Sequence, residues 1–273
     1  MATVVERDQI VALLTEEFAA IAELCDGFDD AAWATPTCLP GWSVKDVVSH
    51  LIGTESVLLG EKAPEVDVSH LTHMKNPPAV NNEVWVESMR GLSGAEVLDR
   101  FRAVTAKRLT ALDAMTQADF DAPSWTPVGP DETYGRFMRV RHYDCFLHEH
   151  DIRAAVGAPD RDERAHVASA LTEPATALGY IVGKKASMPA GARVRITITG
   201  PVDTEYHVAV GERAQVVASL DGGPTVGISL PALLFLRLTG GREDATPHLD
   251  HDVVLEGDRS LATQLATHLA FTI

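Results

Sequence analysis

The sequence predicts two domains, an all-α four-helix bundle at residues 1–158 followed by a small α+β domain at residues 159–273. Long segments of the first part repeat apolar residues at helical spacing, whereas the period-two alternation that is typical of strands occurs only in the second part. The change falls near Ala158–Arg161. With 273 residues and 45% hydrophobic content, the chain is long and apolar enough to build two separate cores.

Four long amphipathic helices joined by long loops are predicted in the first domain, which is the pattern of a four-helix bundle. They cover about Val5–Cys25, Ser43–Gly60, Ser93–Met115 and Tyr134–Val156. The second and third helices each begin with a serine that is followed three residues later by an acidic residue, the spacing of a capping box. Gly157 is placed to end the fourth helix in a left-handed conformation.

Two long stretches between these helices are predicted to be loops. The first is the polar stretch Glu61–Asn82, which Pro77 and Pro78 interrupt. The second is ADFDAPSWTPVGPDETYG, which leads into the fourth helix. Loops of this length inside a compact domain are often functional.

The second domain is predicted to open with a helix at about His166–Gly183. The segments RVRITIT, TEYHVAV and AQVVAS then alternate apolar and polar residues and are predicted strands, and Asp221–Gly223 marks a turn. Ser229–Leu238 is predicted to be a short apolar helix, VVLEG a further strand and Arg259–Leu269 the last helix. This order of elements is typical of an α+β domain.

Composition narrows the classes of function. A formal net charge of −16 repels phosphate backbones, so no nucleic-acid partner is expected. The three cysteines, Cys25, Cys38 and Cys145, are too few and too widely spaced for a disulfide framework or a zinc ribbon, and Cys145 is interpreted as a packed thiol. The N-terminal residues do not resemble a signal peptide, and no apolar run could span a bilayer. We therefore predict a cytoplasmic protein without a membrane partner.

The segment Arg141–Arg153, RHYDCFLHEHDIR, carries a candidate metal site. On a helix, Asp144 and His148 lie on one face, and a carboxylate and an imidazole at this spacing provide half of a divalent-metal site. His50, in the second predicted helix, can supply a third ligand from across the bundle. Three ligands with an open fourth position are typical of a catalytic metal. The alternatives are a simple helix pair for Asp144 and His148, and a core histidine bonded to a carbonyl for His50.

The other polar residues of this segment are sorted by their angle around the helix axis. Arg141 and Asp151 lie on the same side as His148, and Asp151 is a candidate to hold its ring. Three residues point away from this side and are poor candidates for the same site: His142, Glu149 and His150.

Two motifs resemble signatures of a known family. Residues Trp33–His50, WATPTCLPGWSVKDVVSH, look like the N-terminal signature of the mycothiol-dependent maleylpyruvate isomerase family. Residues His148–Arg153, HEHDIR, with an acidic residue four positions earlier, resemble its second signature, and VLEGD at 254–258 looks like the family's C-terminal ending. The resemblance implies a DinB-like four-helix bundle that carries a divalent metal, often zinc. It also implies a following α+β domain that resembles sterol carrier proteins.

By this resemblance, His50, Asp144 and His148 are the metal ligands and the catalytic centre. The acidic ligand of the family is more often Glu, which is one methylene longer than Asp. The implied cofactors are a divalent metal, zinc above all, and mycothiol, the low-molecular-weight thiol of actinobacteria. Candidate contacts for the cofactor or an anionic substrate are Arg237, Arg242 and Arg259 of the second domain, and Asn81 and Asn82 of the loop before the third helix.

The predicted function is a metal-dependent, mycothiol-dependent isomerase or thiol S-transferase that acts on a small electrophilic substrate. In both reactions a bound thiolate attacks the substrate, and the two differ in whether the thiol is released or retained. One alternative is a metal-containing ligand-binding or stress-associated protein, and another is a metal-dependent hydrolase. The expected partners are the small electrophile and the thiol, and the expected oligomeric state is a monomer or a homodimer.

Overall fold

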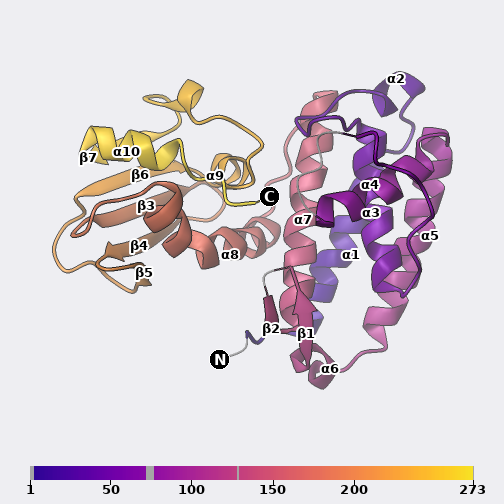
Figure 1. Ribbon diagram of the computed structural model, residues 1–273, viewed down its shortest axis with the longest axis horizontal. Helices are drawn as coiled ribbons and strands as arrows, with labels where there is room; N and C mark the ends of the chain where they lie inside the picture. The colour runs from indigo at the N-terminus through magenta and orange to yellow at the C-terminus, as the bar shows by residue number, and fades with distance from the viewer. Residues whose placement is uncertain (1–2, 72–76, 128, 273) are drawn as a thin grey trace. The chain divides into compact units, whose positions relative to one another are not determined.

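The structure, a computed structural model, describes residues 3–71, 77–127 and 129–272. The chain divides into two compact units, Met1–Arg161 and Asp162–Ile273. The first unit is largely helical, and the second combines a sheet with helices (Figure 1). The sequence analysis placed the boundary after residue 158. Within the described ranges, no helix is both long and apolar enough to cross a membrane.

Four long helices form the body of the first unit and lie side by side in Figure 1. They are α1 (Arg7–Leu24), α3 (Val44–Leu58), α5 (Gly94–Asp113) and α7 (Tyr134–Val156). These are the four predicted helices. Ser43 and Ser93 form the two expected capping boxes, and Gly157 ends α7 with a φ of 69°. The helix ends were therefore encoded locally, by side chains that satisfy the free backbone groups of each terminus.

The connections between these helices hold more structure than the sequence analysis predicted. The loop prediction for Glu61–Asn82 is wrong over its last residues, because α4 (Pro77–Met89) begins at Pro77. Proline is tolerated in the first turn of a helix, where its missing N–H has no partner to lose. Residues 72–76 of the predicted loop lie outside the described residues. The further short elements are α2 (Asp30–Trp33), α6 (Gln117–Asp121) and the antiparallel hairpin of β1 (Pro123–Thr126) and β2 (Gly129–Thr133).

The start of α5 packs directly against an aromatic ring. A Cβ atom added at Gly94 would lie 2.1 Å from the buried Trp33 ring. We expect Gly94→Ala to destabilise the first unit by about 1–3 kcal/mol, because the ring and the helix must move apart. Gly91→Ala is the matched control, since an added Cβ there meets nothing within 4 Å. Urea unfolding measures both, and equal stability of the two variants would contradict the predicted clash.

The second unit is built on a five-stranded sheet in the order β5-β4-β3-β6-β7. Its strands are β3 (Arg193–Thr199), β4 (Thr204–Val210), β5 (Ala214–Val217), β6 (Val226–Pro231) and β7 (Val254–Gly257). Three helices pack against it: α8 (Arg164–Tyr180), α9 (Ala232–Thr239) and α10 (Arg259–Ala266). Only the β3–β6 pair is parallel among the pairs of this sheet.

One predicted helix of the second unit starts too early. Residues 229–231 belong to strand β6, and α9 begins only at Ala232. In β6, Val226, Ile228 and Leu230 are buried and Gly227 is buried between them. The strand passes directly into the helix, and for a short stretch at such a junction periodicity alone does not distinguish strand from buried helix.

Candidate functional site

The three predicted metal ligands meet between two neighbouring helices of the first unit. His50 lies on α3, and Asp144 and His148 lie on α7. The Nε2 atom of His50 is 3.5 Å from Asp144 Oδ2, and the Nε2 atom of His148 is 3.6 Å from Asp144 Oδ1. One ligand atom from each of the three lies within 4.8 Å of the others. This convergence of two imidazole nitrogens and a carboxylate suits a divalent cation.

The two imidazoles are covered and the carboxylate is not. His50 and His148 keep 7% and 4% of their surface exposed, whereas 32% of the Asp144 side chain is exposed. Asp144 and His148 are one helical turn apart, so the spacing alone puts them on one face. The site therefore opens toward solvent at its carboxylate side.

Asp151 holds the ring of His148, as the sequence analysis expected. Its Oδ2 atom lies 3.0 Å from His148 Nδ1, and its carboxylate can only accept this hydrogen bond. The proton of a neutral His148 is therefore on Nδ1, which leaves the lone pair of Nε2 directed at the site. The thiol of Cys38 donates to the other oxygen of Asp151 over 3.2 Å, which links the loop before α3 to α7.

Trp42 forms an aromatic wall beside the two histidines. Its ring lies 5.1 Å from the His50 ring and 6.3 Å from the His148 ring. Its indole Nε1 donates over 2.5 Å to Glu83 Oε1 on α4. The contact between Trp42 and Glu83 is not predicted from the sequence, because no helix is predicted at Pro77–Met89. The only signal for it was the position of Trp42 directly before the helix that carries His50.

A chain of buried charges leads from the bundle core to the site. Arg141 donates to Asp144 Oδ2 over 2.5 Å and to Glu55 Oε1 over 2.8 and 3.0 Å. Arg108 of α5 donates to the other oxygen of Glu55 over 3.1 Å and also bonds Tyr134. The sequence analysis placed Arg141 on the correct side of α7 but did not identify Glu55 or Arg108.

Electrostatics keep these groups in the protonation states that a cation needs. Burial lowers the pKa of the His50 imidazole, against the opposing effect of Asp144, so the ring is neutral at neutral pH. Burial opposes ionisation of Asp144, but the neighbouring His148 ring and the permanent positive charge of Arg141 outweigh it and hold the pKa of that carboxyl well below its usual range. A neutral imidazole and an ionised carboxylate are the forms that bind metal.

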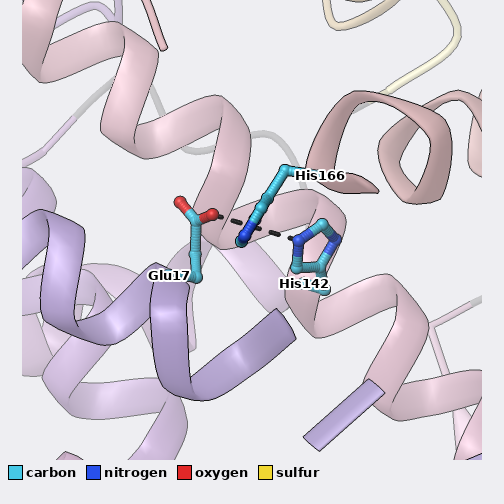
Figure 2. A group of neighbouring side chains, drawn as sticks. All are labelled: Glu17, His142 and His166. Atoms are coloured by element: carbon cyan, nitrogen blue, oxygen red, sulfur yellow. Dashed lines mark ion pairs between the residues drawn. The ribbon is translucent and has the colours of Figure 1, made fainter. Parts of the chain in front are cut away.

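The residues predicted to point away from the site do so. His150 bonds the carbonyl oxygens of Phe146 and Arg161. Figure 2 shows His142 of α7 beside Glu17 of α1. The Nε2 atom of His142 lies 3.9 Å from Oε2 of Glu17. The third residue drawn there, His166, belongs to the second unit.

Glu149 and Cys145 also lie apart from the three ligands. Glu149 pairs with Arg153 and Arg161 over 2.7 and 2.8 Å. Cys145 is fully buried, and burial raises the pKa of its thiol well above the usual range. It is the packed, unreactive thiol that the sequence analysis expected.

The predicted contacts for cofactor or substrate lie outside the two helices that carry the three ligands. Asn82 lies on α4 rather than in a loop, which corrects the sequence analysis. Arg237, Arg242 and Arg259 lie in the second unit. Arg237 and Arg259 pair with Glu243 and Asp250, and Arg242 donates to the carbonyl of Gly240. Their contact with a ligand stays a prediction.

Comparison with known proteins identifies the chain. The sequence profile of the mycothiol maleylpyruvate isomerase N-terminal domain matches residues 14–153. Two crystal structures, of the mycothiol-dependent maleylpyruvate isomerase and of a point mutant of it, each match with a TM-score of 0.61 and 17% identity. Each match covers 94% of this chain and 96% of the other, and at this identity it shows a shared fold. None of the curated proteins matches the sequence.

The fold and the profile place the chain among enzymes that combine a helical bundle with a second, sheet-containing domain. It belongs to the mycothiol maleylpyruvate isomerase family, since the profile spans more than half of the sequence. The resemblance stated from the two motifs is thereby confirmed.

Proposed function

We propose that this enzyme is a divalent-metal-dependent, mycothiol-dependent isomerase or thiol S-transferase that acts on a small electrophilic substrate. One observation carries the metal dependence: ligand atoms of His50, Asp144 and His148 converge within 4.8 Å from two helices. Family membership supports mycothiol as the thiol. The solved relatives are named for maleylpyruvate, which makes it the first substrate to test.

The residues at the site fit a cation such as zinc. Two imidazole nitrogens and one carboxylate oxygen are ordinary zinc ligands, and three protein ligands leave a position open for an incoming group. A divalent cation held there would stabilise the thiolate form of a bound thiol near neutral pH. The buried, neutral His50 and the ionised Asp144 support this assignment.

The surrounding residues orient the ligands and limit access of water. Asp151 keeps the proton of His148 on Nδ1, so that Nε2 faces the site. Trp42, fixed by Glu83, covers the two rings on one side, and the exposed edge at Asp144 leaves the entrance for thiol and substrate. The cationic partner of an anionic substrate is proposed among Arg237, Arg242 and Arg259, and Asn82 is proposed as a cofactor contact.

Metal content and thiol dependence test the proposed function. We expect the purified enzyme to hold about one zinc-type cation per chain. In the cobalt-substituted enzyme, added mycothiol should change the cobalt absorption bands, and turnover of maleylpyruvate should require the thiol. Mass spectrometry of the product separates isomerisation from S-transfer, because only transfer retains the thiol. Metal without any response to thiol would favour a binding protein, and ester hydrolysis without thiol would favour a hydrolase.

A further inference from the structure

Arg141 occupies an unusual place beside the candidate metal centre. It lies three residues before Asp144 on α7 and is 4% exposed. Its Nη1 atom donates to Asp144 Oδ2 over 2.5 Å. The other oxygen of this carboxylate, Oδ1, is the one that lies 3.6 Å from Nε2 of His148. Arg141 therefore holds Oδ2, which also lies 3.5 Å from Nε2 of His50, and leaves Oδ1 facing His148.

The far side of Arg141 is held by the bundle core. Its Nε and Nη2 atoms both donate to Oε1 of Glu55, over 3.0 and 2.8 Å. Glu55 is itself fixed by Arg108, which donates to Oε2 over 3.1 Å. Glu55 and Arg108 are each 2% exposed. Because these hydrogen bonds restrict rotation of the planar Arg141 guanidinium, it holds the Asp144 carboxylate that it contacts in one orientation.

We propose that Arg141 is a positioning residue for the metal centre, clamped by Glu55 so that Asp144 presents one fixed oxygen to the cation. This inference rests on the proposed function, because it assumes that His50, Asp144 and His148 bind metal. Hydrogen-bond partners of metal ligands are worth about 10- to 100-fold in metal affinity. Loss of Arg141 should therefore weaken binding by a factor in that range.

A positioning role and a simple charge role predict opposite signs. If Arg141 acted only through its positive charge, removing it would relieve repulsion and tighten the binding of a divalent cation. If it acts by fixing Asp144, removal lets the carboxylate rotate and binding weakens. If it only fills the core, the variant loses stability while the folded protein keeps its metal affinity.

The test is zinc affinity by chelator competition, which does not depend on activity. We expect Arg141→Met to raise the zinc Kd about 10- to 100-fold. Arg141→Lys keeps the charge but lacks the planar fork that reaches Glu55 and Asp144 together, so it should raise the Kd about tenfold. Unchanged or tighter zinc binding by folded Arg141 variants would overturn the proposal. If Arg141→Met and Arg141→Lys both fail to fold, the zinc affinity of Glu55→Gln tests the proposal instead. This variant loosens Arg141 without changing Asp144, so the proposal requires it to weaken zinc binding.

Arg153→Met is the matched control. Arg153 is another arginine of α7 and pairs over 2.7 Å with the fully buried Glu149, yet no described contact links it to Asp144 or Glu55. It should lower stability but leave the zinc Kd within about threefold of wild type. Wild type without zinc affinity would contradict the proposed function itself. Zinc binding that depends on His148 but not on Arg141 would contradict only the positioning role.

Discussion

Replacing His148 with alanine is expected to abolish metal binding and to lower thiol-dependent turnover about a thousandfold or more. His148 supplies one of only three protein ligand atoms, and its Nε2 lies 3.6 Å from the carboxylate of Asp144. Two remaining ligands do not hold a cation against competing chelators. The measurement is metal content by elemental analysis after dialysis, followed by a turnover assay with mycothiol.

The variant should remain folded. The bundle core is formed by apolar side chains of the long helices, among them Phe18 and Phe101, whose rings meet edge to face at 6.1 Å. Removing the imidazole takes one hydrogen-bond partner from the buried Asp151, a cost of about 1–3 kcal/mol. Circular dichroism and thermal melting separate this modest loss from unfolding.

His150→Gln provides a matched control on the same helix. His150 is 4% exposed, like His148, but bonds backbone carbonyls on another side of α7. This variant should keep its metal. If His148→Ala retained full metal occupancy, or if His150→Gln lost as much, the ligand assignment would be wrong.

Helical spacing explains why so much of the site was predictable. A turn of 3.6 residues puts Arg141, Asp144, His148 and Asp151 along one side of α7, and contacts link all four side chains there. The same spacing excluded His150, which the structure places among backbone carbonyls. Within one helix, the sequence determines which side chains share a face, so no knowledge of the fold was needed.

Contacts between helices were less predictable. That His50 faces α7 depends on how α3 packs, and the sequence offered only its inward-facing neighbours and the family motif. Glu55 and Arg108 were not identified from the sequence, because charged helix residues are rarely fully buried unless they are paired. Their pairing joins α3 with α5 and α7 and becomes visible only in the folded bundle.

The errors in secondary structure have local causes. The first turn of α4 holds two prolines and follows a polar stretch, so it resembled a loop, and the contact of Glu83 with Trp42 was not predicted either. Strand β6 ends at Pro231 and α9 begins at Ala232 with no residue between them, so the end of the strand merged with the predicted helix. In each case the local sequence did not show where the helix begins.

Replacing Glu55 with alanine is expected to destabilise the first unit by about 3–5 kcal/mol, the largest stability effect that we predict. Glu55 is the shared counter-ion of Arg108 and Arg141, and the side chains of these three residues are at most 5% exposed. Without it, two guanidinium groups remain in the core with no carboxylate between them. The remaining bonds to Tyr134 and Asp144 cannot compensate two desolvated charges of equal sign.

Tryptophan fluorescence during urea unfolding measures this effect in the first unit, since all four tryptophans of the chain lie there. Glu55→Gln should cost less than Glu55→Ala, because the amide oxygen still accepts a hydrogen bond. Glu87→Ala is the control: Glu87 pairs with Arg90 over 2.8 Å, but the two side chains are 26% and 36% exposed. Its loss should cost about 0–1 kcal/mol. If Glu55→Ala lowered the free energy of unfolding no more than Glu87→Ala does, the charges of Glu55, Arg108 and Arg141 would not form the rigid clamp that holds Arg141 in place.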